Sequence, residues 1–182
     1  MRKGGSDDGW LCSGQGMDFF LFFCYAYSKT ERKRSGKMAE IRYVQDTDQE
    51  FWYSLDKHLP KAEFQNKVHT KRGYVLWISG KPAGLLRYNL FWDNTPFCTM
   101  LIIEEGYRGM GFGRQLMEHW EKEMRKQGYG MLLTSTQTDE TAQHFYRKLG
   151  YRDCGGFVID IPRYAQPMEL FLIKEIPGEG KL

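Results

Sequence analysis

The stretch that decides the fold is LIIEEGYRGMGFGRQLMEHWEKEMRKQG, from Leu101 to Gly128. It begins inside the segment 97–103, in which the residues that would point to either face of a strand are apolar. This pattern is typical of a strand in the middle of a sheet. A helix is predicted over 113–127, because Leu116, Met117, Trp120 and Met124 share one apolar stripe. The sequence therefore predicts a central strand, a glycine-rich turn and an amphipathic helix in direct succession.

The turn, RGMGFGR from Arg108 to Arg114, suits a pyrophosphate. Its glycines permit positive φ and a close approach to the backbone, and the next helix leaves its first amides unpaired at the positive end of its dipole. Arg108 and Arg114 can add charge-assisted bonds. No Gly-Lys-Ser/Thr follows, and Arg114 stands where a GxGxxG motif needs its third glycine. A purely steric role for the glycines stays open.

Periodicity and turn residues divide the rest of the chain into short elements. The predicted strands cover 40–44, 74–79, 83–91, 97–103, 131–136, 151–159 and 168–174, and the predicted helices cover 51–55, 61–71, 113–127 and 140–149. Thr47 and Glu50 match a capping box for the first helix, and Glu121 is placed to pair with Arg125 on the surface of the third. This order predicts one α/β domain with a mixed sheet.

Residues 1–37 differ from the rest. The apolar run at 19–27 is too short to span a bilayer, which needs ~20 residues, and it lacks the cleavage site of a signal peptide. We expect 1–37 to be a disordered or non-native extension and 38–182 to be the domain, with Met38 as the natural start. The alternative is a short membrane-surface anchor, in which the aromatic run acts with the basic residues that follow it.

The net charge and the cysteine spacing narrow the kinds of partner and metal site that we expect. The net charge is +3 and most basic residues are scattered, so we expect no nucleic-acid partner and no stable membrane association. The four cysteines form no CxxC pair, so we expect no metal site. Reduced thiols fit a cytoplasmic protein.

Two motifs resemble those of the GNAT N-acetyltransferase family. The turn has the Arg/Gln-x-x-Gly-x-Gly/Ala form of the family's acetyl-CoA loop, and AQHFYRKLGY, from Ala142 to Tyr151, looks like its second signature. The resemblance covers about 40–175. It implies a single mixed, mostly antiparallel sheet of six to seven strands with four helices, splayed between strands four and five, and acetyl-CoA as co-substrate.

The resemblance also implies which residues bind acetyl-CoA. Backbone groups of Leu101 and Ile103 would pair with the pantetheine arm, and amides of the turn would hold the pyrophosphate. Asp139 stands where many relatives carry an asparagine that bonds the arm, although it could instead cap a helix. The implied cofactor-binding residues are Leu101, Ile102, Ile103, Arg108, Gly109, Met110, Gly111, Phe112, Gly113, Arg114 and Asp139.

The reaction that the family carries out is attack of a neutral amine on a thioester, which needs a base and an acid. Tyr146 matches the tyrosine that protonates the leaving sulfur, and a phenol with a pKa near 10 suits that role. Its alternative role is a core ring beside Phe145. The predicted base is Glu104, with a solvated surface carboxylate or a water relay as the alternatives.

The acceptor is expected to be a primary amine of a small molecule. Trp52, Tyr88 and Trp92 are candidates to line an apolar or cation-binding pocket, although some of the aromatic residues must belong to the core. A protein N-terminus or lysine as acceptor, a non-catalytic acyl-CoA sensor, and a homodimer stay open.

Overall fold

The computed structural model describes residues 38–177, so the expectation for 1–37 lies outside the described residues. In chain order the elements are β1 (Ala39–Tyr43), η1 (Asp46–Asp48), α1 (Gln49–Leu55), α2 (Lys61–His69), β2 (Gly73–Ile78), β3 (Lys81–Phe91), β4 (Thr95–Ile103), η2 (Glu105–Tyr107), α3 (Phe112–Lys126), β5 (Met131–Gln137), α4 (Ala142–Lys148), β6 (Arg152–Phe157) and β7 (Glu169–Glu175).

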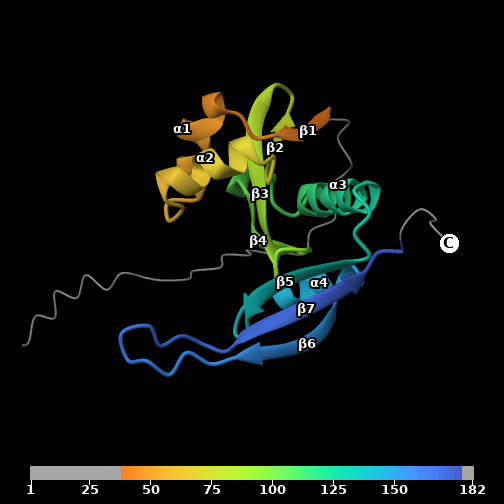
Figure 1. Ribbon diagram of the computed structural model, residues 1–182. Coiled ribbons are helices and arrows are strands. Elements are labelled where there is room, and N and C mark those ends of the chain that lie inside the picture. Colours follow the sequence, from red (N-terminus) through yellow and green to blue (C-terminus); the bar gives the residue numbers. More distant parts are fainter. Residues whose placement is uncertain (1–37, 178–182) are drawn as a thin grey trace, which may run out of the picture.

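The strands form one sheet in the order β1-β2-β3-β4-β5-β7-β6. Every neighbouring pair is antiparallel except β4 with β5, which is parallel. This confirms the predicted mixed, mostly antiparallel sheet with four helices. Figure 1 shows the sheet as two arms, β1–β4 above and β5, β7 and β6 below.

The two arms touch over a very short length. β4 and β5 pair only at Phe97 with Leu133 and at Cys98 with Thr134. Beyond these pairs the strands run apart, so a gap opens toward the carboxyl ends of both strands. The predicted splay between strands four and five is therefore present.

A bulge in β4 lies at the point where the splay begins. Arg87 pairs with Met100 and Tyr88 pairs with Cys98, so Thr99 is an extra residue in β4. A bulge of this kind bends its strand and increases the local twist. It turns the last residues of β4 away from β5, which explains why the pairing stops after Cys98.

Helices cover both faces of the upper arm. In Figure 1, α1 and α2 lie on one side of β1–β4 and α3 lies on the other. The α1/α2 side is filled by a cluster of buried residues, Val44, Trp52, Leu59, Phe64, Val75, Leu85 and Met100. The α3 side belongs to a larger cluster that continues under α4 and includes Leu101, Leu116, Trp120, Leu132, Tyr146 and Leu172.

Local structure departs from the predicted capping box. The side chain of Thr47 lies in the short helix η1 and is exposed, whereas Asp48 Oδ2 accepts the amide of Gln45 at 2.8 Å. Arg42 also donates to both oxygens of the buried Asp48, each at 2.7 Å. The capping box thus lies two residues earlier than predicted, at Gln45 and Asp48, and Asp48 has a cationic partner in β1 as well.

Candidate active site

The glycine turn begins α3 in a conformation that favours glycine. Gly111 is the residue before the helix and has φ 86°, and Gly109 has φ 73°. The first intrahelical bond joins Gln115 N to Gly111 O at 3.1 Å, so the amides of 112–114 have no partner inside the helix. Because α3 is 15 residues long, its N-terminus also carries the full partial charge of a helix dipole.

Three motif segments meet around Gly113. A methyl group built on Gly113 would lie 3.6 Å from Phe145 Cζ and 3.7 Å from Ile103 Cγ1. The start of α3 is therefore in contact range of the end of β4 and of α4, although these segments are up to 42 residues apart in the chain (145 − 103). The family's two signatures thus come together at the open end of the β4/β5 gap.

The main chain at the end of β4 faces this gap. Residues of an antiparallel strand direct their N–H and C=O groups alternately to the two sides. The amide of Glu104 donates to Ala83 O in β3 at 2.8 Å, so the main-chain groups of Ile103 and Leu101 point away from β3. They therefore have the direction that pairing with an inserted, extended group would require.

The arginines of the turn are bonded to the protein itself. Arg108 Nε donates to Ile103 O at 2.8 Å, which ties the turn to the end of β4. Arg114 donates to Glu118 at 3.3 Å and to the carbonyl of Lys148 at 3.4 Å, which links α3 to the end of α4. Both side chains thus hold the shape of the turn.

The other residues predicted to bind acetyl-CoA differ in how far their side chains are exposed to solvent. Met110 is exposed at the tip of the turn, and Phe112 is buried against the ring of Tyr107 at 6.3 Å. The side chain of Ile102 packs on the α1/α2 cluster. Asp139 is exposed between β5 and α4, and since the residue before α4 is Thr141, Asp139 is not the cap of that helix.

Tyr146 lies on the inner face of α4 and is 2% exposed. Its ring packs edge-on against Phe145 at 5.3 Å and against Tyr151 at 5.8 Å between centroids. Because Phe145 borders Gly113, Tyr146 is one residue away from the segment where the motifs meet. Glu104, by contrast, is exposed at the residue before η2.

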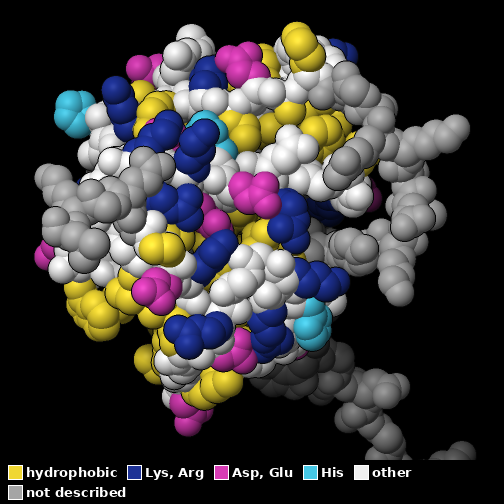
Figure 2. Space-filling view, turned by 90° about the vertical axis from the view of Figure 1, so that its right-hand side faces the viewer, with side chains coloured by type: hydrophobic (Ala, Val, Ile, Leu, Met, Phe, Trp, Pro, Cys, Tyr) yellow, Lys and Arg dark blue, Asp and Glu magenta, His cyan; other side chains and the backbone are white. Residues whose placement is uncertain are grey.

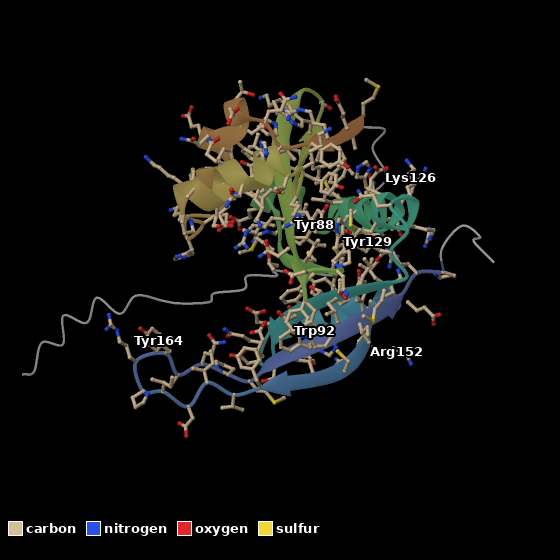
Figure 3. The ribbon with its side chains drawn as sticks, in the orientation of Figure 1. Tyr88, Trp92, Lys126, Tyr129, Arg152 and Tyr164 are labelled. Atoms are coloured by element: carbon tan, nitrogen blue, oxygen red, sulfur yellow. The ribbon has the colours of Figure 1, made fainter. Side chains whose placement is uncertain are left out.

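Two of the three predicted acceptor residues are core residues. Trp52 is 0% exposed and packs edge-on against Phe64 at 5.6 Å, so its ring fills the space under α1 and α2. Tyr88 is 4% exposed between β3 and α3, 5.8 Å from Trp120, where burial raises its pKa to about 12 (Figure 3). Both rings are enclosed by core residues in this structure, and their assignment to the acceptor pocket stays a prediction.

Trp92 is on the surface, as expected of a residue that contacts a ligand. It is 73% exposed in the β3–β4 turn and lies 4.5 Å from Phe91 (Figure 3). Phe91 is the first of five neighbouring rings, which we call the aromatic row. Its rings neighbour one another at 4.5–6.4 Å across β3, β4, β7 and β6, and its members are Phe91, Trp92, Phe97, Phe171 and Phe157.

A buried carboxylate lies at the end of this row, at a position that no sequence motif marks. Glu169, the first residue of β7, is 1% exposed, and among residues 38–177 neither of its carboxylate oxygens has a hydrogen-bond partner. Burial raises its pKa, the nearby Ser135 hydroxyl opposes the rise, and the charge of Glu140 adds to it. A glutamate that opens an apolar strand is the only sequence signal for it.

Residues 38–177 were also searched for a metal site and for a helix that could span a membrane. Within 38–177 there is no group of three or more His, Cys, Asp or Glu side chains arranged to hold a metal ion. No helix of that part of the chain is long and apolar enough to cross a membrane. The side of the molecule on which α3 lies carries Lys and Arg side chains interleaved with Asp and Glu (Figure 2).

The comparisons with known proteins agree with this geometry. The profile of the acetyltransferase (GNAT) family matches residues 40–151, which is more than half of the chain. No curated protein matches.

Among the solved structures with the same fold are three whose alignments each cover 76% of this chain. Ard1 from Thermoplasma volcanium has 17% identity and a TM-score of 0.67 over 98% of its own chain. Naa50 from Arabidopsis thaliana, solved with the bisubstrate analogue CoA-Ac-MVNAL, has 18% identity and a TM-score of 0.61 over 99%. N-acetylglutamate synthase from Neisseria gonorrhoeae, complexed with coenzyme A and N-acetyl-glutamate, has 14% identity and a TM-score of 0.63 over 35%. The chain belongs to the GNAT family of acetyl-CoA-dependent N-acetyltransferases.

Proposed function

We propose that this chain transfers the acetyl group of acetyl-CoA to a primary amine of a small molecule, by direct attack in a ternary complex. The observation that carries the proposal is the meeting of β4, the glycine turn and α4 around Gly113, at the open end of the β4/β5 gap. Amides of a helix start, strand-edge groups and a buried tyrosine are there within one small region. In this proposal they hold the pyrophosphate, hold the pantetheine arm and protonate the sulfur.

Binding of acetyl-CoA in this proposal uses mainly the backbone. The amides of 109–114 would hold the pyrophosphate, as helix starts do for anions in general. Leu101 and Ile103 would pair with the pantetheine arm through the main-chain groups that face the gap. Arg108 and Arg114 would act by fixing the turn, since both donate to backbone carbonyls of neighbouring segments.

In the chemical step, the amine nitrogen attacks the thioester carbonyl carbon and the carbon–sulfur bond breaks. Tyr146 would give its phenol proton to the departing sulfur, since a thiolate is a poor leaving group unless it is protonated. The enclosed position of Tyr146 favours this role, because water competes poorly for a buried proton. A bound amine must first lose its ammonium proton, which requires a base.

The test of cofactor binding compares two glycines at opposite ends of α3. Gly111 and Gly128 have φ 86° and 88°, and a methyl group on either would meet no atom within 4 Å. Gly111→Ala and Gly128→Ala therefore carry similar backbone strain, on the order of 1–2 kcal/mol. We expect only Gly111→Ala to weaken acetyl-CoA binding by tenfold or more in calorimetric titration. Equal affinities of the two variants would contradict the assignment of the turn.

The acceptor is tested by thiol release from acetyl-CoA with a panel of amines. The panel contains small primary amines, a peptide with a free N-terminus and a peptide with a single lysine. Release with small amines and not with peptides supports the proposal. Binding of acetyl-CoA without release for any amine would identify the chain as an acyl-CoA sensor instead.

A further inference from the structure

Glu169 is a buried charge-bearing group for which the described residues supply no ion pair. It is 1% exposed, none of those residues lies within hydrogen-bond geometry of its two oxygens, and the nearby Ser135 hydroxyl is the one group that favours its charged form. Burying a carboxylate without a partner is costly, so such groups in native proteins need an explanation. A compensating cation within the described chain would remove the cost, but all the ion pairs found there involve other carboxylates.

The carboxylate lies on the face of the lower arm that α4 does not cover. Glu169 pairs with Gln137 of β5 on one side and with Phe157 of β6 on the other, and residues paired in this way share a face. Leu170 and Leu172 alternate to the opposite face, where they belong to the core cluster that includes residues of α4. Glu169 is thus on one face of the lower arm and Tyr146 on the other, and β5, which borders the gap, is the strand next to Glu169.

The neighbours of Glu169 on this face are polar toward β5, where Gln137 and Ser135 lie, and aromatic along β7 and toward β6. Phe157 is directly opposite, Phe171 is two residues along the same strand, and the two rings are 5.7 Å apart. The stacked pair of Phe171 and Phe97, 5.7 Å apart, continues the row across β5 to β4 at the start of the gap. The outer rings, Phe157 and Trp92, are exposed. A carboxylate at the end of an aromatic row is complementary to an ammonium group on an apolar body.

We infer that Glu169 binds the ammonium group of the acceptor and takes its proton, and that the aromatic row holds the apolar remainder of that amine. The inference rests on the proposed function and narrows it to primary amines whose body is apolar. It assigns to Glu169 the role that the sequence analysis gave to Glu104, which is exposed to solvent.

The Glu169 carboxylate removes one proton from R–NH3⁺, and the lone pair of R–NH2 forms the new carbon–nitrogen bond. The carbon–sulfur bond breaks, Tyr146 protonates the sulfur, and the second proton lost from nitrogen restores the phenol. The products are R–NH–CO–CH3, coenzyme A thiol and the proton that Glu169 later returns to solvent. A pKa raised by burial suits a base that works near neutral pH.

The experiment measures kcat/KM for 2-phenylethylamine against pH in the wild type and in Glu169→Gln. Glutamine has the shape of the protonated acid, so a merely structural Glu169 predicts unchanged activity. If Glu169 is the base, the wild type has a flat region between the pKa of Glu169 and that of the amine. The variant, which can use only the free amine, rises tenfold per pH unit through the same region. At pH 7 we expect a fall of at least a hundredfold in the variant.

Three controls make the result decisive. Glu175→Gln changes an exposed glutamate in the same strand and should leave the profile flat. Acetyl-CoA affinity and melting temperature of Glu169→Gln should match the wild type, which shows that fold and cofactor site are intact. Ethanolamine in place of 2-phenylethylamine should lower kcat/KM of the wild type by tenfold or more, because it lacks an apolar body.

Two outcomes would overturn the inference. The first is a flat profile and activity within threefold of wild type in Glu169→Gln, and the second is a sloped profile in Glu104→Gln alone. Failure of the proposed function would look different, because the wild type itself would then bind acetyl-CoA and release no thiol with any amine.

Discussion

Changing Tyr146 to phenylalanine separates the phenol proton from the packing of its ring. The ring is 2% exposed and lies 5.3 Å from Phe145 and 5.8 Å from Tyr151 between centroids. Phenylalanine keeps both contacts, and only the hydroxyl is lost. We therefore expect the free energy of unfolding to change by no more than about 0.5–1.5 kcal/mol, the net worth of one hydrogen bond.

The expected effect on turnover is larger than the effect on stability. General acid catalysis typically contributes about 10²–10⁴-fold, which is about 3–5 kcal/mol of transition-state free energy. Some of this loss can be recovered through water, so we expect kcat to fall at least tenfold. Acetyl-CoA affinity should stay near the wild-type value, because the proton transfer contributes only in the transition state.

The matched control is Tyr151→Phe, on the neighbouring ring. Tyr151 is also 2% exposed, and its hydroxyl has no hydrogen-bond partner in the part of the chain that the structure describes. Its removal should leave kcat within twofold of wild type. The assay is single-turnover thiol release, so that product release does not hide the chemical step. A kcat of Tyr146→Phe within twofold of wild type, or equal falls in both variants, would refute the role of Tyr146 as acid.

Two further predictions concern stability. Burial lowers the pKa of Lys67 from 10.5 to about 8, and Arg87 adds to the effect, so the unfolded chain binds more protons between these values and stability rises with pH. We therefore expect wild type to gain about 3 kcal/mol of unfolding free energy over Lys67→Met, measured with urea, between pH 7 and pH 10.5. A difference between the two proteins that stays constant with pH would exclude the lowered pKa of Lys67. A methyl group on Gly84 would lie 2.9 Å from Ile102 O, so Gly84→Ala should lower the unfolding free energy by about 1–3 kcal/mol, whereas Gly130→Ala, with open space, should not.

The order and type of the elements follow from local sequence signals, and the structure confirms them. Their limits shift where a turn is tighter than expected. β3 begins at Lys81 instead of Ala83, because Ser79 and Gly80 alone make the turn, with φ 50° and 78°. Two positive φ values in succession are the geometry of a two-residue hairpin, so Pro82 lies inside the strand rather than in the turn.

Side-chain environment was harder to predict, because it depends on contacts between distant segments. Glu121 was expected to pair with Arg125 on the surface of α3. It is buried and accepts a hydrogen bond from Lys174 of β7 at 2.5 Å, 53 residues away. The complete burial of Trp52 was not predictable for a similar reason. Periodicity shows that Phe51, Trp52 and Leu55 share a helix face, but not which of them reaches the centre of the cluster.

A role in binding or catalysis could be proposed from the sequence only for residues that belong to a recognisable motif. The glycine turn and Tyr146 belong to motifs that are contiguous in sequence. Glu169 belongs to none, because its burial results from Gln137 and Phe157 on two flanking strands. Nothing in the chain near Glu169 indicates those neighbours.

The junction of only two residue pairs between β4 and β5 has a consequence for the lifetime of the protein in a cell. With so little backbone pairing between β4 and β5, the two arms are held together mainly by the larger core cluster, and we expect the edge of the β4/β5 gap to open at less cost than the strands on either side. A bound molecule that bridges the gap would act as a brace. At a concentration a hundred times its Kd it would add about 2.7 kcal/mol to the stability of the closed state. The abundance of the enzyme would then follow the supply of acetyl-CoA, because proteases act mainly on the opened chain.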